Sequence, residues 1–356
     1  MLKEKKKELQ RGNAPLLGVK GQSPLYFGEN LFNQIVEFCG KGKVVIVADR
    51  AVEDLYGRAL AKRVGAELLT ISGGERTKTL ESAMDLMSEL FKIGAGRDTT
   101  LVAVGGGVTT DLVAFVASIY LRGVPLILVP TTLLAIVDAS IGGKTAVDTS
   151  FGKNLIGTFY PAKAIFSDLK TLETLPEREW LNGLAEILKM GLILDASIWE
   201  MDERDPSLIQ KAIEGKIAVV EQDPEERSLR RILNFGHTIG HALEAISCYE
   251  MSHGEAVALG CCVEAHLSMR LGYLSEEDFA RVRKKYERFF LKLPKEYRRS
   301  IFLQALSYDK KRAAGQMRFV LIDRIGHAIP FGEDYCTVVT PDELEPTLDW
   351  MERVFF

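Results

Sequence analysis

The sequence predicts two domains, a parallel α/β domain followed by a mainly α-helical domain. With 356 residues, the chain is long for a single hydrophobic core. In the first half, short β-branched apolar runs alternate with helical patterns, which is typical of a parallel sheet covered by helices. After Pro176 the apolar residues recur at helical spacing over long stretches. We therefore expect domains at residues 1–177 and 178–356.

Each expected element follows from its local pattern. The expected strands are short apolar runs at residues 44–49, 66–72, 99–107, 124–130 and 164–168. A helix is expected at 80–96, where apolar residues are three or four apart. The expected helices of the second half cover residues 178–194, 206–222, 229–247, 254–271 and 275–290. Near the end of the chain, RFVLIDRIGHAIPF predicts a short hairpin.

Composition and charge restrict the classes of partner. A net charge of −4 argues against nucleic acid as a partner. The five cysteines form no CxxC pair, which is typical of a reducing compartment. No apolar run is long enough to span a bilayer, and the charged start is not followed by the apolar segment of a secretion signal. We expect a soluble, cytoplasmic protein with no nucleic-acid or membrane partner.

A cluster of histidines is the strongest indication of chemistry. Three of the five histidines, His237, His241 and His253, lie close together in NFGHTIGHALEAISCYEMSHGE. His237 and His241 are four residues apart, so on a helix they share a face. The cluster indicates a metal site or an acid–base site. The alternative is a polar stripe on a core helix.

A glycine-rich turn indicates a phosphate site. LVAVGGGVTTD places three glycines between an expected strand and a helical pattern, where backbone amides can approach a phosphate. The motif is not GxGxxG, so a tight turn without a ligand is the alternative. Polar residues follow other strands too: Asp49, Glu75 with Lys78, and Thr131 with Thr132. Together they favour a nucleotide at the carboxyl edge of the sheet, although Asp49 could be a turn residue and the threonines a helix cap.

Basic and polar residues concentrate in three further segments. Between Arg122 and Asn154, glycines precede Lys144 and Lys153, which predicts donors aimed at an anion. In NGLAEILKMG, Glu186 and Lys189 share a helix face, either as a surface ion pair or as a partly buried pair. Finally, a polar stripe is expected to run along one continuous helix through Glu226, Arg230, Asn234, His237 and His241.

These motifs together resemble the 3-dehydroquinate synthase family. The resemblance rests on GGGVTTD, PTTLLAIVDASIGGKTAVD, GKNLIGTFYPAKAIFSD, NGLAEILKMG, LRRILNFGHTIGHALE, HGEAVALG and the late DKK, which occur in order from about residue 44 to residue 326. It implies a Rossmann-like N-terminal domain, a mainly helical C-terminal domain, an active site in the cleft between them, and a homodimer. It also implies conversion of 3-deoxy-D-arabino-heptulosonate 7-phosphate to 3-dehydroquinate and phosphate. NAD would be used catalytically, with one divalent metal, zinc or cobalt.

The resemblance also implies roles for individual residues. Glu186, His237 and His253 would hold the metal, and His241 and Glu226 would be acid–base candidates. Residues that match substrate contacts are Lys144, Asn154, Lys189, Lys216, Arg230, Asn234 and one of Lys310 and Lys311. Arg122 would reach the phosphate site of the neighbouring subunit. Residues that match NAD contacts are Asp49, Glu75, Lys78, Gly106, Gly107, Val108, Asp111, Thr131, Thr132, Asp138, Lys144, Lys153, Thr171, Thr174 and Asn182.

Some positions depart from the commonest family pattern. Ala114 stands where glycine is usual, Ala139 where serine is usual, and Asp148 where many members have asparagine. Three rival functions remain: another sugar phosphate cyclase, a metal- and NAD-dependent polyol dehydrogenase, and a non-catalytic nucleotide-binding protein. Arg230 with Lys216 favours a substrate that carries a carboxylate, and the number of anion-binding lysines argues against a dehydrogenase.

Overall fold

The structure is a computed structural model that describes residues 23–356 except 41, 151, 249 and 313–315, and excludes the side chains of residues 307–312. The chain forms two compact units, one ending at Trp180 and the other beginning at Leu181. The expected domain boundary at residues 177 and 178 falls at the start of helix α6 (Glu177–Ile193). The domain assignment at that point stays a prediction.

The first unit is built on a six-stranded sheet in which all pairs are parallel. The strand order is β1-β8-β5-β4-β2-β3. The strands are β1 (Leu25–Gly28), β2 (Val44–Asp49), β3 (Glu67–Ile71), β4 (Thr100–Gly105), β5 (Leu126–Pro130) and β8 (Ala164–Asp168). The five strands expected from the sequence are confirmed, whereas the edge strand β1 was not expected.

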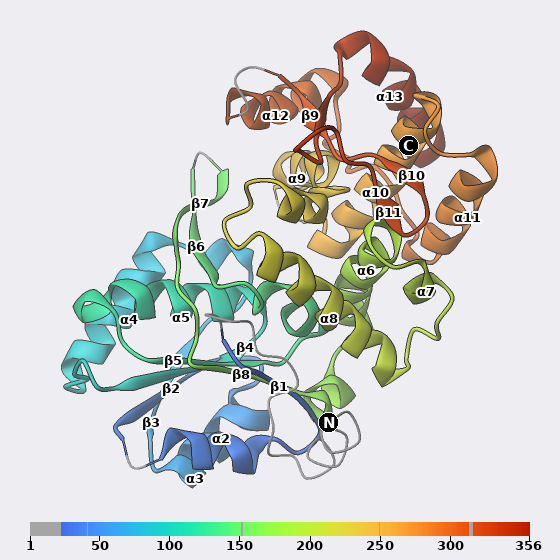
Figure 1. Cartoon of the computed structure of the whole chain (residues 1–356). Helices are drawn as coiled ribbons and strands as arrows, with labels where there is room; N and C mark the ends of the chain where they lie inside the picture. Colours follow the sequence, from blue (N-terminus) through green and yellow to red (C-terminus); the bar gives the residue numbers. More distant parts are fainter. Residues whose placement is uncertain (1–22, 41, 151, 249, 313–315) are drawn as a thin grey trace. The chain divides into compact units, whose positions relative to one another are not determined.

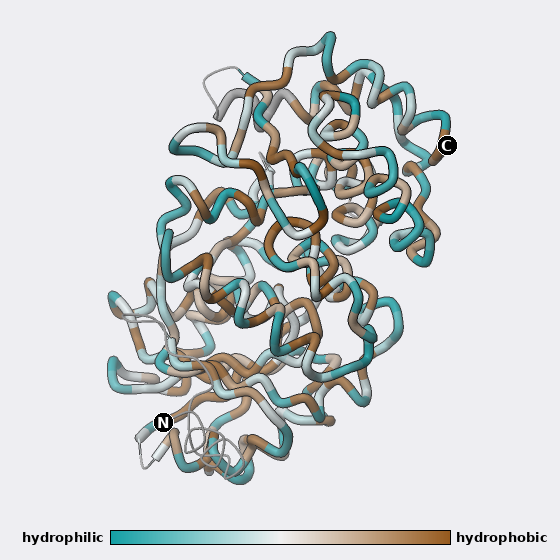
Figure 2. Tube along the Cα trace, turned by 45° about the vertical axis from the view of Figure 1, so that its right-hand side comes forward, coloured by the Kyte–Doolittle hydropathy of each residue, from teal (hydrophilic) through white to brown (hydrophobic). Residues whose placement is uncertain are grey.

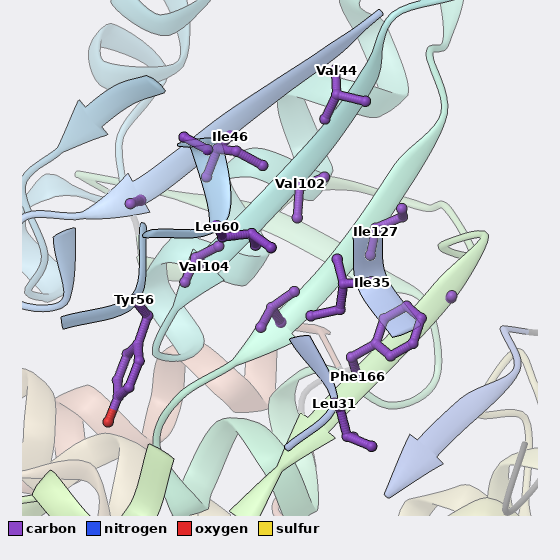
Figure 3. Packing of buried hydrophobic residues seen from close by; sticks show 14 residues of the cluster. Leu31, Ile35, Val44, Ile46, Tyr56, Leu60, Val102, Val104, Ile127 and Phe166 are labelled. Carbon is purple, nitrogen blue, oxygen red and sulfur yellow. The ribbon is translucent and has the colours of Figure 1, made fainter. Parts of the chain in front are cut away.

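Helices cover both faces of this sheet. In Figure 1, α2 (Phe32–Cys39) and α3 (Arg58–Val64) lie on one face, and α4 (Leu80–Lys92) and α5 (Gly107–Ile119) lie on the other. Aliphatic side chains of β2, β4 and β5 pack against α2 and α3 in a buried cluster that includes Ile46, Val102 and Ile35 (Figure 3). Burying this apolar surface on both faces fixes the positions at which the strands end.

A two-stranded antiparallel hairpin was not expected. It pairs β6 (Lys144–Thr149) with β7 (Gly152–Phe159). β7 is mostly exposed and contains two glycines, and β6 contains charged residues, so the alternating pattern of a half-buried strand is missing. The sequence therefore shows only polar residues in tight turns where the structure has strands.

The second unit is mainly helical. Besides most of α6, its helices are α7 (Ala196–Trp199), α8 (Pro206–Gln222), α9 (His237–Ile246), α10 (His253–Arg270), α11 (Glu276–Tyr286), α12 (Arg299–Arg312) and α13 (Pro341–Phe355). α10 is buried along most of its length and packs against α9, α11 and α13. In Figure 2, hydrophobic segments run through the interior of each unit, and hydrophilic segments lie mainly at its periphery.

The expected continuous helix at 229–247 is wrong. The structure has a short 3-10 helix, η6 (Leu229–Asn234), then a break at Gly236, and then α9. Gly236 has a φ of 79°, in the left-handed region that ends regular helix. The polar stripe from Glu226 to His241 is therefore divided between two elements. Helical spacing alone cannot detect such a break, because the apolar residues on both sides keep the same period.

The expected hairpin near the end of the chain is confirmed. β10 (Ile322–Arg324) pairs with β11 (His327–Ala328) in an antiparallel arrangement. A second short pair joins β9 (Arg318–Phe319) and β12 (Thr337–Val338). Among the described residues, the helices are too short or too polar to cross a membrane.

Candidate metal and nucleotide sites

Three predicted metal ligands from three helices converge in the second unit. Glu186 comes from α6, and His237 and His253 are the first residues of α9 and α10. Glu186 Oε1 lies 3.3 Å from His237 Nε2 and 3.0 Å from His253 Nε2. One ligand atom from each residue lies within 4.8 Å of the other two. Residues far apart in the sequence thus point their donor atoms at one place.

The other ring nitrogen of each of these histidines faces an oxygen. His253 Nδ1 lies 3.4 Å from Oε2 of Glu244, a buried carboxylate on α9. His237 Nδ1 lies 3.2 Å from the backbone oxygen of Phe235. Such contacts fix the ring orientation and turn Nε2 toward Glu186, as in proteins where histidine binds a metal. The arrangement therefore supports metal binding by Nε2 of both histidines.

Glu186 is buried, the two histidines are partly buried, and charged groups of both signs surround them. Burial opposes ionisation of Glu186, but Lys189 and the two imidazoles outweigh it and hold the pKa of this carboxyl well below its usual range. Burial also lowers the pKa of His253, but Glu244 and Glu186 raise it to about 10. Lys189 forms an ion pair with Glu186, and its Nζ donates to the backbone oxygen of Leu233 at 2.7 Å.

The donor set fits a divalent transition metal. Two imidazole nitrogens and one carboxylate oxygen are the set found in catalytic zinc sites, which keep a position open for water or substrate. The buried Glu186 carboxylate supplies a negative charge that a bound cation would compensate. His241 is one turn further along α9, and its ring centroid lies 5.1 Å from that of His237 and 6.5 Å from that of His253. It borders the cluster.

The segment around η6 places further predicted residues. Glu226 Oε1 accepts a hydrogen bond of 2.7 Å from Asn234 Nδ2, so the predicted acid–base residue and the predicted substrate contact are paired. Arg230 is buried, and its Nη1 donates to the backbone oxygen of Pro224 at 2.7 Å. Lys216 is also buried, on α8. Both side chains are buried cations of this unit and are candidates for binding an anion.

Asn182 belongs to the same unit as the metal ligands. It was predicted as an NAD contact, and its side-chain oxygen accepts a hydrogen bond of 3.0 Å from the backbone amide of Gly254. A Cβ on Gly254 would lie 2.4 Å from the Cα of Asn182, so the two backbones touch. Asn182 therefore helps to fix the start of α10, next to His253.

In the first unit, the strand order indicates where a nucleotide would bind. The chain runs from β2 outward to β3 and then returns to β4 and β5 on the other side, so the order reverses between β2 and β4. Ligands of open parallel sheets bind at the carboxyl ends of the strands beside such a reversal. Asp49 ends β2 and Gly105 ends β4. The predicted residues therefore lie where this topology places a ligand.

Two glycines at this edge allow close packing around the start of α5. Gly106 is the N-cap of α5 and has no side-chain cap, so amides of the first turn, which includes Val108, remain available. A Cβ on Gly106 would lie 3.1 Å from Thr132, and a Cβ on Gly107 would lie 3.3 Å from Ala139. The buried hydroxyl of Thr131 has no hydrogen-bond partner among the described atoms. These features fit a dinucleotide whose phosphates approach the start of α5.

Lys78 contacts two other predicted residues. Its buried Nζ lies 2.6 Å from Asp111 Oδ2 and 2.6 Å from Asn154 Oδ1. Lys153 Nζ lies 3.0 Å from Glu75 Oε1. These contacts link the segment after β3 to the β6–β7 hairpin. Residues predicted for NAD and for substrate therefore form one polar network in the first unit.

Three other predicted residues have local roles. Thr132 accepts a hydrogen bond of 3.2 Å from the amide of Ala135, so it caps the helical segment at residues 133–139, which includes the π-helix η4 (Ala135–Ala139) and Asp138. Thr171 donates to the backbone oxygen of Asp168, and the Thr174 hydroxyl lies 2.6 Å from that of Tyr56. The hydrogen bond of Thr132 confirms the alternative interpretation that this residue is a helix cap. Its role in NAD binding stays a prediction.

Several predicted residues have unusual backbone geometry. Among the described non-glycine residues with positive φ are Arg122 (71°), Asn154 (55°) and Glu226 (60°). Asparagine tolerates this region, but arginine and glutamate rarely adopt it, and such strain concentrates at functional sites. Lys144 and Arg122 are exposed. Lys310 and Lys311 lie outside the residues whose side chains are described.

Two buried carboxylates near the cluster were missed by sequence reasoning. They are Glu244, beside His253, and Glu264 on α10. Glu244 is the single acid of α9, and Glu264 lies in the apolar middle of α10, so both stand where a core residue is expected. That contrast was a usable signal, because a carboxylate is almost never fully buried unless it is paired.

Comparison with known proteins shows to which family this chain belongs. Residues 68–182 match the family described as 3-dehydroquinate synthase N-terminal, and residues 183–312 match 3-dehydroquinate synthase C-terminal. A 3-dehydroquinate synthase of Thermodesulfovibrio yellowstonii is 39% identical over 338 residues, which cover 89% of this chain and 90% of the relative. The chain belongs to the 3-dehydroquinate synthase family. A family member from Methylococcus capsulatus is 41% identical over 333 residues and covers 88% of this chain and 92% of its own.

Solved structures of related cyclases share the fold of this 3-dehydroquinate synthase family member. A 2-epi-5-epi-valiolone synthase from Streptomyces hygroscopicus, solved with NAD⁺ and Zn²⁺ bound, has a TM-score of 0.85 and 28% identity, covering 95% of this chain and 98% of its own. A 2-deoxy-scyllo-inosose synthase, solved with carbaglucose-6-phosphate, NAD⁺ and Co²⁺, has a TM-score of 0.83 and 27% identity, covering 91% and 95%. A glycerol dehydrogenase from Schizosaccharomyces pombe at 17% identity shares the fold alone.

Proposed function

We propose that this protein is a 3-dehydroquinate synthase. It converts 3-deoxy-D-arabino-heptulosonate 7-phosphate to 3-dehydroquinate and phosphate. The proposal rests on one observation above all: in a member of this family, Glu186, His237 and His253 bring a metal donor set together from three helices. The reaction is a phosphate elimination, so the enzyme is a carbon–oxygen lyase of aromatic amino acid biosynthesis.

NAD binds at the carboxyl edge of the sheet in the first unit. The uncapped start of α5, the orphaned Thr131 hydroxyl and the position of Asp49 beside the reversal in strand order support this assignment. Gly106 and Gly107 let the start of α5 pack closely against Thr132 and Ala139, and Lys78 holds Asp111 and Asn154 near the site. When bound, NAD supplies a reversible hydride acceptor, so an alcohol is oxidised and the resulting ketone is later reduced.

A divalent metal is held by Glu186, His237 and His253. When bound, it supplies Lewis acidity to the substrate hydroxyl that is oxidised. Glu244 and the Phe235 carbonyl hold the two imidazoles with Nε2 toward the site. His241, one turn further along α9, is placed to exchange a proton with the substrate or with the departing phosphate.

The anionic substrate is bound by residues that carry positive charge or donate hydrogen bonds. Its phosphate and carboxylate account for the number of cations among the predicted contacts in a chain of net charge −4. Arg230 and Lys216 are buried, and a buried cation is stable only beside an anion or a dense set of acceptors. The pairing of Asn234 with Glu226 orients an amide and a carboxylate for the same purpose.

Assembly and location are part of the proposal. We propose a homodimer in the cytoplasm, to which Arg122 of one protomer contributes at the phosphate site of its partner. The exposed apolar residues Leu155, Ile156 and Phe159 on β7 support a protein contact in the first unit. Light scattering at micromolar concentration should report twice the mass of the chain, and a monomer would refute the dimer.

One assay tests the reaction and separates the rivals. The metal-loaded protein is incubated with the heptulosonate phosphate and NAD below stoichiometry, while phosphate, dehydroquinate and NADH are measured. We expect many phosphates released for each NAD and no accumulation of NADH, because each turnover returns the hydride. NADH formed one for one with product would indicate a dehydrogenase. Turnover of a sugar phosphate without a carboxylate, with none on the heptulosonate, would indicate another cyclase.

A further inference from the structure

The helix that carries two of the histidines begins without a capping side chain of its own. The N-cap of α9 is Gly236, in the left-handed region, with no side-chain hydrogen bond. Other helices of this unit are capped by their own residues: Asp205, Ser252, Ser275 and Thr340. The first amides of any helix need acceptors, and α9 must therefore find them elsewhere.

A buried carboxylate on another helix supplies them. Glu264 of α10 accepts a hydrogen bond of 2.7 Å from the Gly236 amide at Oε2 and one of 3.4 Å from the Ile239 amide at Oε1. Glu264 is fully buried. Burial raises the pKa of this carboxyl to about 8, against the lowering effect of the amides, so the position is unfavourable for an acid. A carboxyl group at this position supplies acceptors to these amides that an apolar core residue would not supply.

The two helices touch backbone to backbone at this point. A Cβ on Gly260 would lie 1.9 Å from the Gly236 oxygen, and a Cβ on Gly236 would lie 2.6 Å from Cys261 Sγ. The start of α9 is therefore fixed against α10 by contact as well as by hydrogen bonds. Little adjustment is possible without moving the chain that follows Gly236.

The residues that follow Gly236 include predicted members of the metal cluster. His237 is the next residue, and its Nε2 lies 3.3 Å from Glu186 Oε1. His241 follows one turn later. The hydrogen bonds of Glu264 go to backbone amides of this turn, so its effect on the imidazoles passes through the backbone.

We propose that Glu264 is a positioning residue, which holds the first turn of α9 so that His237 presents its Nε2 to the metal. The inference rests on the proposed metal site. A carboxylate that only stabilises the fold would lower the melting temperature when removed but leave the affinity for metal unchanged. A positioning residue would change the affinity and the coordination geometry.

The test compares three variants of the full chain without substrate. Glu264→Ala removes both acceptors, Glu264→Gln keeps one acceptor oxygen, and Leu348→Ala is a control that destabilises the same unit from the buried face of α13. Zn²⁺ affinity is measured by competition with a chromophoric chelator, and Co²⁺ absorption reports coordination geometry. We expect Glu264→Ala to bind Zn²⁺ about 10- to 100-fold more weakly with an altered Co²⁺ spectrum. Glu264→Gln should be intermediate, and Leu348→Ala should keep its affinity within about twofold.

Two results would overturn the inference. One is a folded Glu264→Ala protein with the affinity and spectrum of the unmodified chain. The other is an equal loss of affinity in Leu348→Ala, which would show that general destabilisation is the cause. If Glu264→Ala does not fold, the comparison of Glu264→Gln with Leu348→Ala decides by the same criterion. If the unmodified chain binds no metal, or His253→Ala binds it equally well, the proposed metal site itself fails, and the inference fails with it.

Discussion

At the scale of single residues, the two imidazoles of α9 have different surroundings. His237 faces Glu186 and has its Nδ1 against a backbone oxygen, whereas His241 lies one turn further along the helix. We therefore propose that the first binds a metal and the second transfers a proton. Their spacing of four residues makes them neighbours without requiring both to bind the same ion.

This division predicts different outcomes for two alanine variants. His237→Ala should lose the bound metal, because a third of the donor set is gone. His241→Ala should keep metal and NAD but lose turnover by about 10²- to 10⁴-fold, the usual contribution of a general acid or base. Metal analysis by plasma emission and NAD titration distinguish the two. An empty metal site in both variants would make His241 a ligand.

Asp148 provides a test of pH dependence in the first unit. Burial raises its pKa to about 6, against the lowering effects of the Asn154 amide, Lys78 and Lys153, while Glu75 raises it further. The folded pKa lies above the unfolded value, so the folded state holds more protons between about pH 4 and pH 6. The contribution of Asp148 to stability is thus fully present at low pH and is lost as pH rises through this window.

Asp148→Asn should remove that dependence. The shift corresponds to about 3 kcal/mol at most, and solvent screening of this partly exposed group reduces it to about 1–2 kcal/mol. The difference in free energy of unfolding between variant and unmodified protein should therefore grow from pH 4 to pH 6 in favour of the variant, then stay constant. Denaturant titrations at several pH values measure it. A difference that is flat across the window would contradict the assignment.

At the scale of elements, the close approach of α9 and α10 is the most sensitive feature. Gly260→Ala would place a Cβ 1.9 Å from the Gly236 oxygen and force the helices apart. We expect a loss of stability of about 1–3 kcal/mol or more, together with weaker metal binding, because His237 and His253 begin these helices. Calorimetry and metal analysis measure the two effects.

A matched glycine in the same unit serves as the control. Gly215 lies inside α8, where a Cβ would meet only the side-chain ends of Leu194 and Met190, at 3.0 and 3.2 Å. Gly215→Ala should fold and bind metal normally, since flexible side chains can move and alanine favours helix. Loss of metal binding in this control would mean that any substitution of a helical glycine in this unit weakens metal binding.

Some helices and strands can be predicted from the sequence, and others cannot. The strands such as Val44–Asp49 and the start of α5 follow from local apolar runs and glycines, so the sequence predicts them. The break at Gly236 and the hairpin of β6 and β7 depend on contacts between segments and leave no distinct period. The metal ligands came from resemblance to a family, whereas Glu264 required a contact between α9 and α10 that spacing cannot reveal.

At the scale of the whole molecule, metal and fold are thermodynamically linked. A ligand that binds only the folded state stabilises it, by about 2.7 kcal/mol when the free ligand is a hundred times its dissociation constant. Removing metal with a chelator should therefore lower the melting temperature, and adding Zn²⁺ should restore it. Differential scanning fluorimetry measures the shift. His253→Ala should melt at the lower temperature with or without chelator, and a chelator-sensitive melt in this variant would contradict the assignment of the ligands.

The left-handed backbone at Arg122 and Glu226 has a consequence for directed evolution. Each of these side chains sits in a conformation that costs roughly 1–3 kcal/mol and that glycine adopts freely. A library screened only for survival of heating should accumulate glycine at both positions. The same library screened for growth without aromatic amino acids should retain arginine and glutamate. A difference between the residues selected in the two screens would identify positions at which this protein loses stability in return for catalytic activity.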